Sequence, residues 1–115
     1  MALTAKSCVT MAEVREEIDR VDRLIVPLLL ERLEYIRQAG HIKPRRDQVR
    51  DPARIEDVVA KAKKTAAAMT DSTTSLHAIH EKYVDEIYRH LIEWSIAHEF
   101  VVFDDRSDDT KAANG

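Results

Sequence analysis

The stretch VREEIDRVDRLIVPLLLERLEYIRQAGHIK, residues 14–43, carries the strongest structural signal in the chain. Its apolar residues recur in steps of four and three, as in a helix that packs along one seam: Val14, Ile18, Val21, Ile25 and Leu28. A helix from Met11 to about Gly40 would be roughly 45 Å long at about 1.5 Å per residue. A compact domain of this size does not need so long a helix, so we expect an intertwined oligomer. Pro27 should kink this helix or stretch its pitch, because proline lacks a backbone N–H.

Two further helices are predicted after the first. Asp51 suits the N-cap and Pro52 suits the first helical position, so the second helix should begin there and continue to about Met69. A third helix should follow, from about Thr74 to Val101 or Val102. The predicted fold class is therefore all-α, with three helices in each subunit and a long first helix.

Composition agrees with one small helical domain. The chain has 115 residues, of which only two are Gly and three are Pro, while 34% are charged. We expect a helical domain over residues 11–102, between flexible polar tails at 1–10 and 103–115. The net charge of −3 argues against a generic nucleic-acid binder. No signal peptide or membrane span is evident, so we expect a cytoplasmic protein that binds neither membrane nor nucleic acid.

One row of side chains in the third predicted helix ends in polar groups. At helical spacing the row consists of Tyr83, Ile87, Leu91, Ser95 and Glu99. Its first three members favour burial, and a carboxylate is rarely buried without a partner. Either the row reaches the surface at Glu99, or something inside the protein needs that acid.

Cations occur where an apolar seam is expected. Continuing the first helix's seam past Leu28 leads to Arg32, and Arg15 lies next to the start of the seam. The following loop adds five cations: Lys43, Arg45, Arg46, Arg50 and Arg54. These residues fit a solvated basic surface, a nucleic-acid patch without aromatic residues for base stacking, or a site for a small dianion. The dianion site fits better, although spacing alone leaves all three open.

Metal and covalent chemistry find little support in the sequence. His77 and His80 are three residues apart, but no Glu-x-x-His pair accompanies them. There is no Gly-rich phosphate loop, and the single cysteine, Cys8, lies in a predicted tail. We therefore predict a site that needs no metal and no cofactor.

Together these residues resemble a known family. Residues 14–43 are similar to the first helix of the all-helical chorismate mutases of the AroQ class, and the match includes Arg15, Arg32 and Lys43. The element VRDPAR resembles the start of that family's second helix, and LIEWSIAHEF resembles the end of its third. The resemblance covers roughly residues 12–100. It implies a homodimer of three-helix subunits whose first helices cross between protomers.

The resemblance also implies roles for individual residues. Arg32 would bind one carboxylate of chorismate, and Arg15 from the partner subunit would bind the other. Lys43 would reach a carboxylate and the ether oxygen. Arg54 would line the mouth of the pocket. Ser95 would assist at a carboxylate, and the backbone near Asp51 would contact the ring hydroxyl.

Two positions depart from the family pattern. Glu99 replaces the glutamine that commonly donates to the ether oxygen, and an ionised carboxylate has no proton to donate. The hypothesis is that Glu99 acts in its protonated form. Ile55 replaces a glutamate that contacts the C4 hydroxyl of chorismate in typical mutases. A subgroup with this fold, the isochorismate-pyruvate lyases of salicylate biosynthesis, also has an apolar residue at that point.

The activity implied first is therefore that of a chorismate mutase, a shikimate-pathway enzyme that forms prephenate from chorismate. Ser95 and the AHEF ending favour the mutase. Ile55, Trp94 and the leader SCVTMAEVREEID favour the lyase, which forms salicylate and pyruvate. A non-catalytic helical dimer is a third alternative, but such a module has little physical reason to keep cations on a packing seam.

Overall fold

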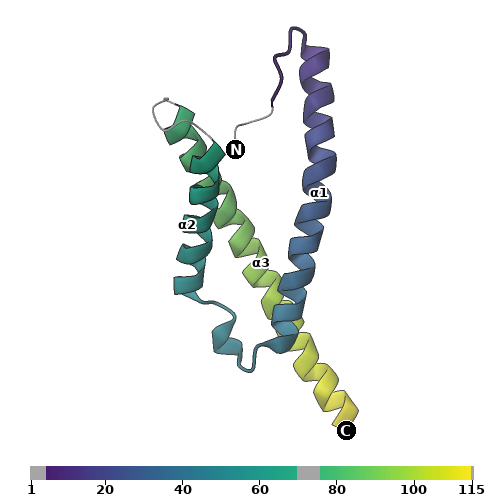
Figure 1. The fold of residues 1–115 in the computed structure, drawn as a ribbon. Coiled ribbons are helices and arrows are strands. Elements are labelled where there is room, and N and C mark those ends of the chain that lie inside the picture. Colours follow the sequence, from purple (N-terminus) through teal and green to yellow (C-terminus); the bar gives the residue numbers. More distant parts are fainter. Residues whose placement is uncertain (1–4, 70–75, 115) are drawn as a thin grey trace.

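A computed structural model describes residues 5–69 and 76–114 of the chain, with side chains described as far as Arg106. Its elements are α1 (Met11–Ile42), the short 3-10 turn η1 (Arg46–Gln48), α2 (Pro52–Met69) and α3 (Leu76–Asn114) (Figure 1). No strand occurs in the described ranges, so the predicted all-α fold with a long first helix is confirmed. None of these helices is both long and apolar enough to cross a membrane, among the residues described.

The helix starts follow from local capping. The Thr10 hydroxyl accepts a hydrogen bond of 3.2 Å from the Glu13 backbone N–H, and the Glu13 carboxylate accepts one of 3.0 Å from the Val9 N–H. These two bonds form a variant of the capping box. Asp51 Oδ1 likewise accepts from the Arg54 N–H at 3.1 Å at the start of α2. Both predicted starts are confirmed, and α1 continues through Pro27 without a break.

The third helix is longer than predicted. Its expected start at Thr74 lies outside the described residues, but its expected end at Val101 or Val102 is wrong, because α3 continues to Asn114. The physical reason is that Phe103 is buried in the core and therefore extends the apolar face of the helix by another turn. No Gly or Pro interrupts the sequence before Gly115. The flexibility expected for residues 1–10 and 103–115 stays a prediction.

The chain is elongated. α3 contacts both other helices, α2 along its first half and α1 near the end of that helix, while the start of α1 stands away from both (Figure 1). The chain measures 65 × 31 × 19 Å, and its radius of gyration is 18.7 Å. A compact domain of this length has a radius of gyration of roughly 13 Å. Much of α1 therefore has no packing partner within its own chain.

The core is small, and its position differs from the predicted row. The buried apolar residues are Val49, Val59, Ile92, Ile96 and Phe103. Ser95 and Glu99 are each only 4% exposed, whereas Tyr83 is 65% and Ile87 is 49% exposed. The expectation that the apolar members are buried is wrong for Tyr83 and Ile87 within one chain. The reason is that α1 diverges from α3 toward the start of α1, so the first half of α3 has only α2 beside it (Figure 1).

The seam of α1 is also largely uncovered. Ile18, Val21, Ile25 and Leu28 all count among the exposed large apolar residues. Tyr83 on α3 is exposed as well, so large apolar side chains of both helices are open to water.

Candidate active site

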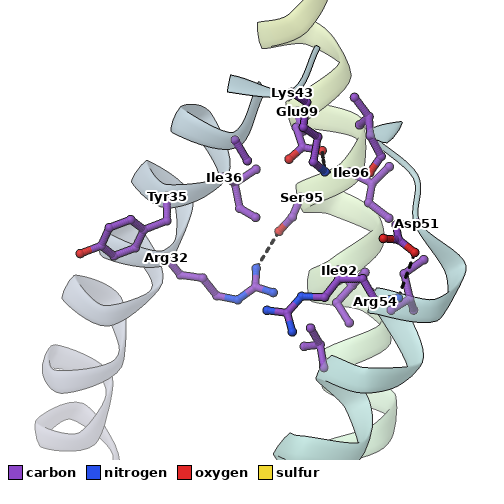
Figure 2. A pocket seen from close by; sticks show the side chains of 14 residues that line it. Arg32, Tyr35, Ile36, Lys43, Asp51, Arg54, Ile92, Ser95, Ile96 and Glu99 are labelled. Atoms are coloured by element: carbon purple, nitrogen blue, oxygen red, sulfur yellow. Dashed lines mark hydrogen bonds and ion pairs between the residues drawn. The ribbon is translucent and has the colours of Figure 1, made fainter. Parts of the chain in front are cut away.

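A cavity of about 440 Å³ lies between the end of α1, the loop that follows it, the first turns of α2 and the second half of α3. Its 14 lining residues are Arg32, Tyr35, Ile36, Ala39, Lys43, Val49, Asp51, Arg54, Ile55, Val58, Ile92, Ser95, Ile96 and Glu99. Half of these residues are aliphatic, and five charged side chains stand among them (Figure 2). Such a wall strengthens electrostatic interactions with anything bound inside.

Arg32 is held in place by Ser95. Its Nη1 donates to Ser95 Oγ at 3.0 Å, and Ser95 Oγ in turn donates to the backbone carbonyl of Leu91 at 2.7 Å. Because the single hydroxyl proton of Ser95 goes to that carbonyl, Ser95 presents only lone pairs to Arg32. In this arrangement Ser95 orients the guanidinium and has no proton left for a second acceptor.

Lys43 and Glu99 form the polar end of the cavity. Lys43 Nζ donates to Glu99 Oε2 at 2.9 Å and to the backbone carbonyl of Val49 at 3.4 Å. The Glu99 side chain is 5% exposed and that of Lys43 is 30% exposed. The partner that the buried Glu99 requires is therefore Lys43, which follows the last residue of α1.

Arg54 faces the cavity from the start of α2. Its side chain and that of Arg32 point toward each other across the cavity (Figure 2). Arg54 Nη1 also donates to Asp57 Oδ2 at 2.6 Å. Hydrogen bonds from Lys61 and from Arg54 hold the pKa of the Asp57 carboxyl below its usual value. Asp57 thus fixes the arginine from outside while the rest of the guanidinium remains available to an anion.

The structure brings six of the seven predicted site residues to one cavity and leaves one outside. Arg32, Lys43, Asp51, Arg54, Ser95 and Glu99 all line it. Asp51 uses its carboxylate to cap α2, so that its backbone is the part left for other contacts. Arg15 is exposed on α1 and does not line the cavity. It lies 17 residues before Arg32, or about 25 Å along the helix.

Sequence reasoning missed several contributors. The Val49 carbonyl shares Lys43 with Glu99, and Tyr35 and Ile36 line the cavity from α1. Asp57 could have been found from its spacing, because it lies three residues after Arg54 in a helix. Nothing in the sequence indicates the contact of the Val49 carbonyl with Lys43, because this contact depends on how the loop after α1 folds back. No cluster of three or more metal-binding side chains occurs among the residues that the structure describes.

Comparison with known proteins adds two findings. The sequence model of the family described as chorismate mutase type II matches residues 14–100. The chain is also 25% identical over 96 residues to a Pseudomonas aeruginosa protein named isochorismate pyruvate lyase. That match covers 84% of this chain and 87% of the other protein.

Proposed function

The chain belongs to the chorismate mutase type II family, and we propose that it converts chorismate to prephenate. The observation that carries the proposal is the meeting of Arg32, Lys43 and Arg54 with the buried Glu99 in one largely apolar cavity. The cavity holds these three cations and only two acids, Asp51 and Glu99, which suits a small molecule with two carboxylates.

The reaction needs no covalent catalysis. One bond forms between two carbons while the ether C–O bond breaks, and no proton or electron leaves the substrate. The enzyme therefore contributes by holding the substrate in a compact conformation and by stabilising negative charge on the ether oxygen. Arg32 binds one carboxylate, and Arg54 adds positive potential at the mouth. Lys43 reaches a carboxylate and the ether oxygen.

Glu99 is the second donor at the ether oxygen, in its protonated form. To act in this way it gives up its ion pair with Lys43, whose Nζ then turns to the substrate. A protonated carboxyl donates one hydrogen bond, as a glutamine amide does. Ser95 supports catalysis through Arg32, because its hydroxyl proton is already committed to the Leu91 carbonyl.

A homodimer completes the site. The exposed seam of α1 supports this part of the proposal, since a second copy of the helix would remove it from water. The partner subunit then supplies Arg15, which binds the second carboxylate. This arrangement explains why a cation stands next to an apolar seam so far from the cavity of its own chain.

Isochorismate-pyruvate lyase is the second candidate. Two observations favour it: the similarity to the Pseudomonas aeruginosa protein of that name, and Ile55, which lines the cavity without a polar group. The lyase needs much the same cations for a substrate of the same charge. Ser95 and the AHEF ending favour the mutase.

The test offers chorismate and isochorismate to the purified protein in separate assays. We expect prephenate from chorismate. Salicylate and pyruvate from isochorismate, with no product from chorismate, would instead assign the lyase activity. Lys43→Met should lower kcat/KM by at least about a hundredfold, in the range for losing one transition-state donor. Lys64→Met, at an exposed position of α2, is the matched control and should keep full activity. Turnover of neither substrate would contradict both proposals and leave the non-catalytic dimer.

A further inference from the structure

The last part of α3 lies beyond the region that matches the family. The match ends at residue 100, whereas the helix continues to Asn114. This extension runs past the end of α1 and the beginning of the loop that follows it (Figure 1). Its first turns, residues 101–106, therefore lie beside the segment that carries Lys43.

Arg46 connects the loop to this extension. Its Nε donates to Asp104 Oδ1 at 3.0 Å, and its Nη2 donates to Asp104 Oδ2 at 3.4 Å. The guanidinium carbon also lies 4.5 Å from the centre of the Phe100 ring, within the range of a cation–π contact. A two-pronged arginine–carboxylate pair fixes direction as well as distance.

Arg106 connects the extension to the end of α1. Its Nη1 donates to the backbone carbonyl of His41 at 2.5 Å, and its guanidinium carbon lies 3.9 Å from the centre of the Phe103 ring. The last carbonyls of a helix lack partners within the helix, and a cation there also complements the helix dipole. Phe103 is buried in the core, so the ring that contacts the Arg106 guanidinium is held in place by its packing.

These contacts bracket Lys43. His41 lies two residues before it and Arg46 three residues after it, and both are bound to the same stretch of α3. Glu99, the partner of Lys43, lies on α3 two residues before residues 101–106. We infer that residues 101–106 are a clamp that holds Lys43 against Glu99, with Arg46, Asp104 and Arg106 as positioning residues. The catalytic consequence rests on the proposed function, whereas the structural one does not.

The size of the effect follows from exposure. The side chains of Arg46 and Asp104 are 61% and 50% exposed. Exposed pairs contribute little, so losing this one should raise the opening of the loop by roughly two- to fivefold. The effect should shrink in about 1 M salt, which screens exposed charges.

The test measures the loop and Lys43 directly. Amide hydrogen exchange over residues 43–50 and acylation of Lys43 relative to Lys64, both read by mass spectrometry, are compared in the full-length wild type and four variants. Arg46→Gln, Asp104→Asn and Arg106→Gln should each speed up both by roughly two- to fivefold. Asp105→Asn is the matched control, since Asp105 is exposed on the same turn of α3. It should leave both rates unchanged.

A charge exchange separates positioning from general destabilisation. The double variant Arg46→Asp with Asp104→Arg should restore slow Lys43 acylation, because the pair is rebuilt with its charges reversed. Exchange at core positions such as Val59 and Ile92 should stay at the wild-type rate in all variants. Wild-type loop exchange and Lys43 acylation in Arg46→Gln and Asp104→Asn would overturn the clamp. That result is independent of whether either substrate is turned over, so it is distinguishable from failure of the proposed function.

Discussion

Lys43 Nζ lies 2.9 Å from Oε2 of Glu99, and the two side chains belong to segments 56 residues apart in the chain. The pair is uneven, because Glu99 is buried while Lys43 is partly open to water. The acid therefore depends on the lysine more than the lysine depends on the acid. Both are groups that the proposed reaction needs, so this contact links stability to activity.

Removing the lysine alone should destabilise the protein. Lys43→Met leaves the Glu99 carboxylate buried without its donor, which should lower the free energy of unfolding by about 1–3 kcal/mol. Adding Glu99→Gln should recover part of this loss, because a neutral amide costs less to bury than an unpaired charge. Urea unfolding of the two single variants, the double variant and the control Lys64→Met measures the coupling. Strictly additive effects would show that the two side chains do not interact.

The activity should depend on pH through Glu99. The protonated-donor hypothesis requires kcat/KM to fall toward high pH, because an ionised carboxylate has no proton to donate to the ether oxygen. Glu99→Gln keeps an N–H donor at every pH and should flatten the profile. The measurement is kcat/KM with chorismate from about pH 5 to about pH 8 for both proteins. A wild-type profile that is already flat over this range contradicts the protonated donor.

Complementation tests whether Arg15 acts across a dimer interface. Arg15→Ala and Arg32→Ala should each inactivate their own homodimer. In a mixed dimer, one site carries both changes and the other carries neither. Co-refolding equal amounts should give half mixed dimers, each with one intact site, and therefore roughly a quarter of the wild-type activity. Activity that stays at the level of the separate variants would place Arg15 and Arg32 in the same site of one chain, or outside the site.

Gly40 should be intolerant of a side chain. It is the one buried residue of α1, and a Cβ there would lie 2.9 Å from Val102 Cγ1 and 3.2 Å from the Glu99 carbonyl oxygen. Valine is stiff at its Cβ and a backbone oxygen cannot turn away, so the two helices would have to separate. Gly40→Ala should cost about 1–3 kcal/mol of stability.

The expected loss of stability in Gly40→Ala has the opposite sign to the effect of this change at an exposed helical site. At an exposed helical site the same change stabilises by about 1 kcal/mol, because alanine is the better helix former. Val102→Ala should relieve part of the loss by removing the nearest methyl group. Thermal and urea unfolding of the two single variants and the double variant provide the measurement. A stabilising Gly40→Ala would show that the helices do not approach so closely.

Acid should weaken the contact between α2 and α3. Arg89 donates to both carboxylate oxygens of Glu56, at 3.0 and 3.1 Å, and to Asp85 at 2.8 Å. The hydrogen bonds from Arg89 lower the pKa of Glu56 and of Asp85. A carboxyl with a lowered pKa stabilises the fold above its unfolded value, about 4, and loses this contribution as pH falls through the folded value.

Arg89→Gln should therefore destabilise the protein at pH 7 and have a smaller effect near pH 3, because the contribution of these carboxylates declines once the pH falls below their unfolded value. Urea unfolding at both pH values, with Lys64→Gln as the control, measures the difference. An equal loss at both pH values would mean that Arg89 acts through packing instead of charge.

The helices themselves followed from local signals. Apolar periodicity placed α1, and the Thr10 and Asp51 caps define where α1 and α2 begin, because each acts within a few residues along the chain. The cations of the site could also be identified from the sequence, because an arginine on a packing seam is unusual enough to require a partner or a ligand.

The arrangement of those helices depended on contacts between distant residues. The close approach at Gly40 brings Lys43 to Glu99, and Phe103 with Asp104 and Arg106 carries α3 past the end that its sequence pattern indicated. Burial is a property of the assembled helices, so the row on α3 shows its polar members inside and Tyr83 outside. A helical period states which residues share a face, but only the crossing of the helices states where that face is covered.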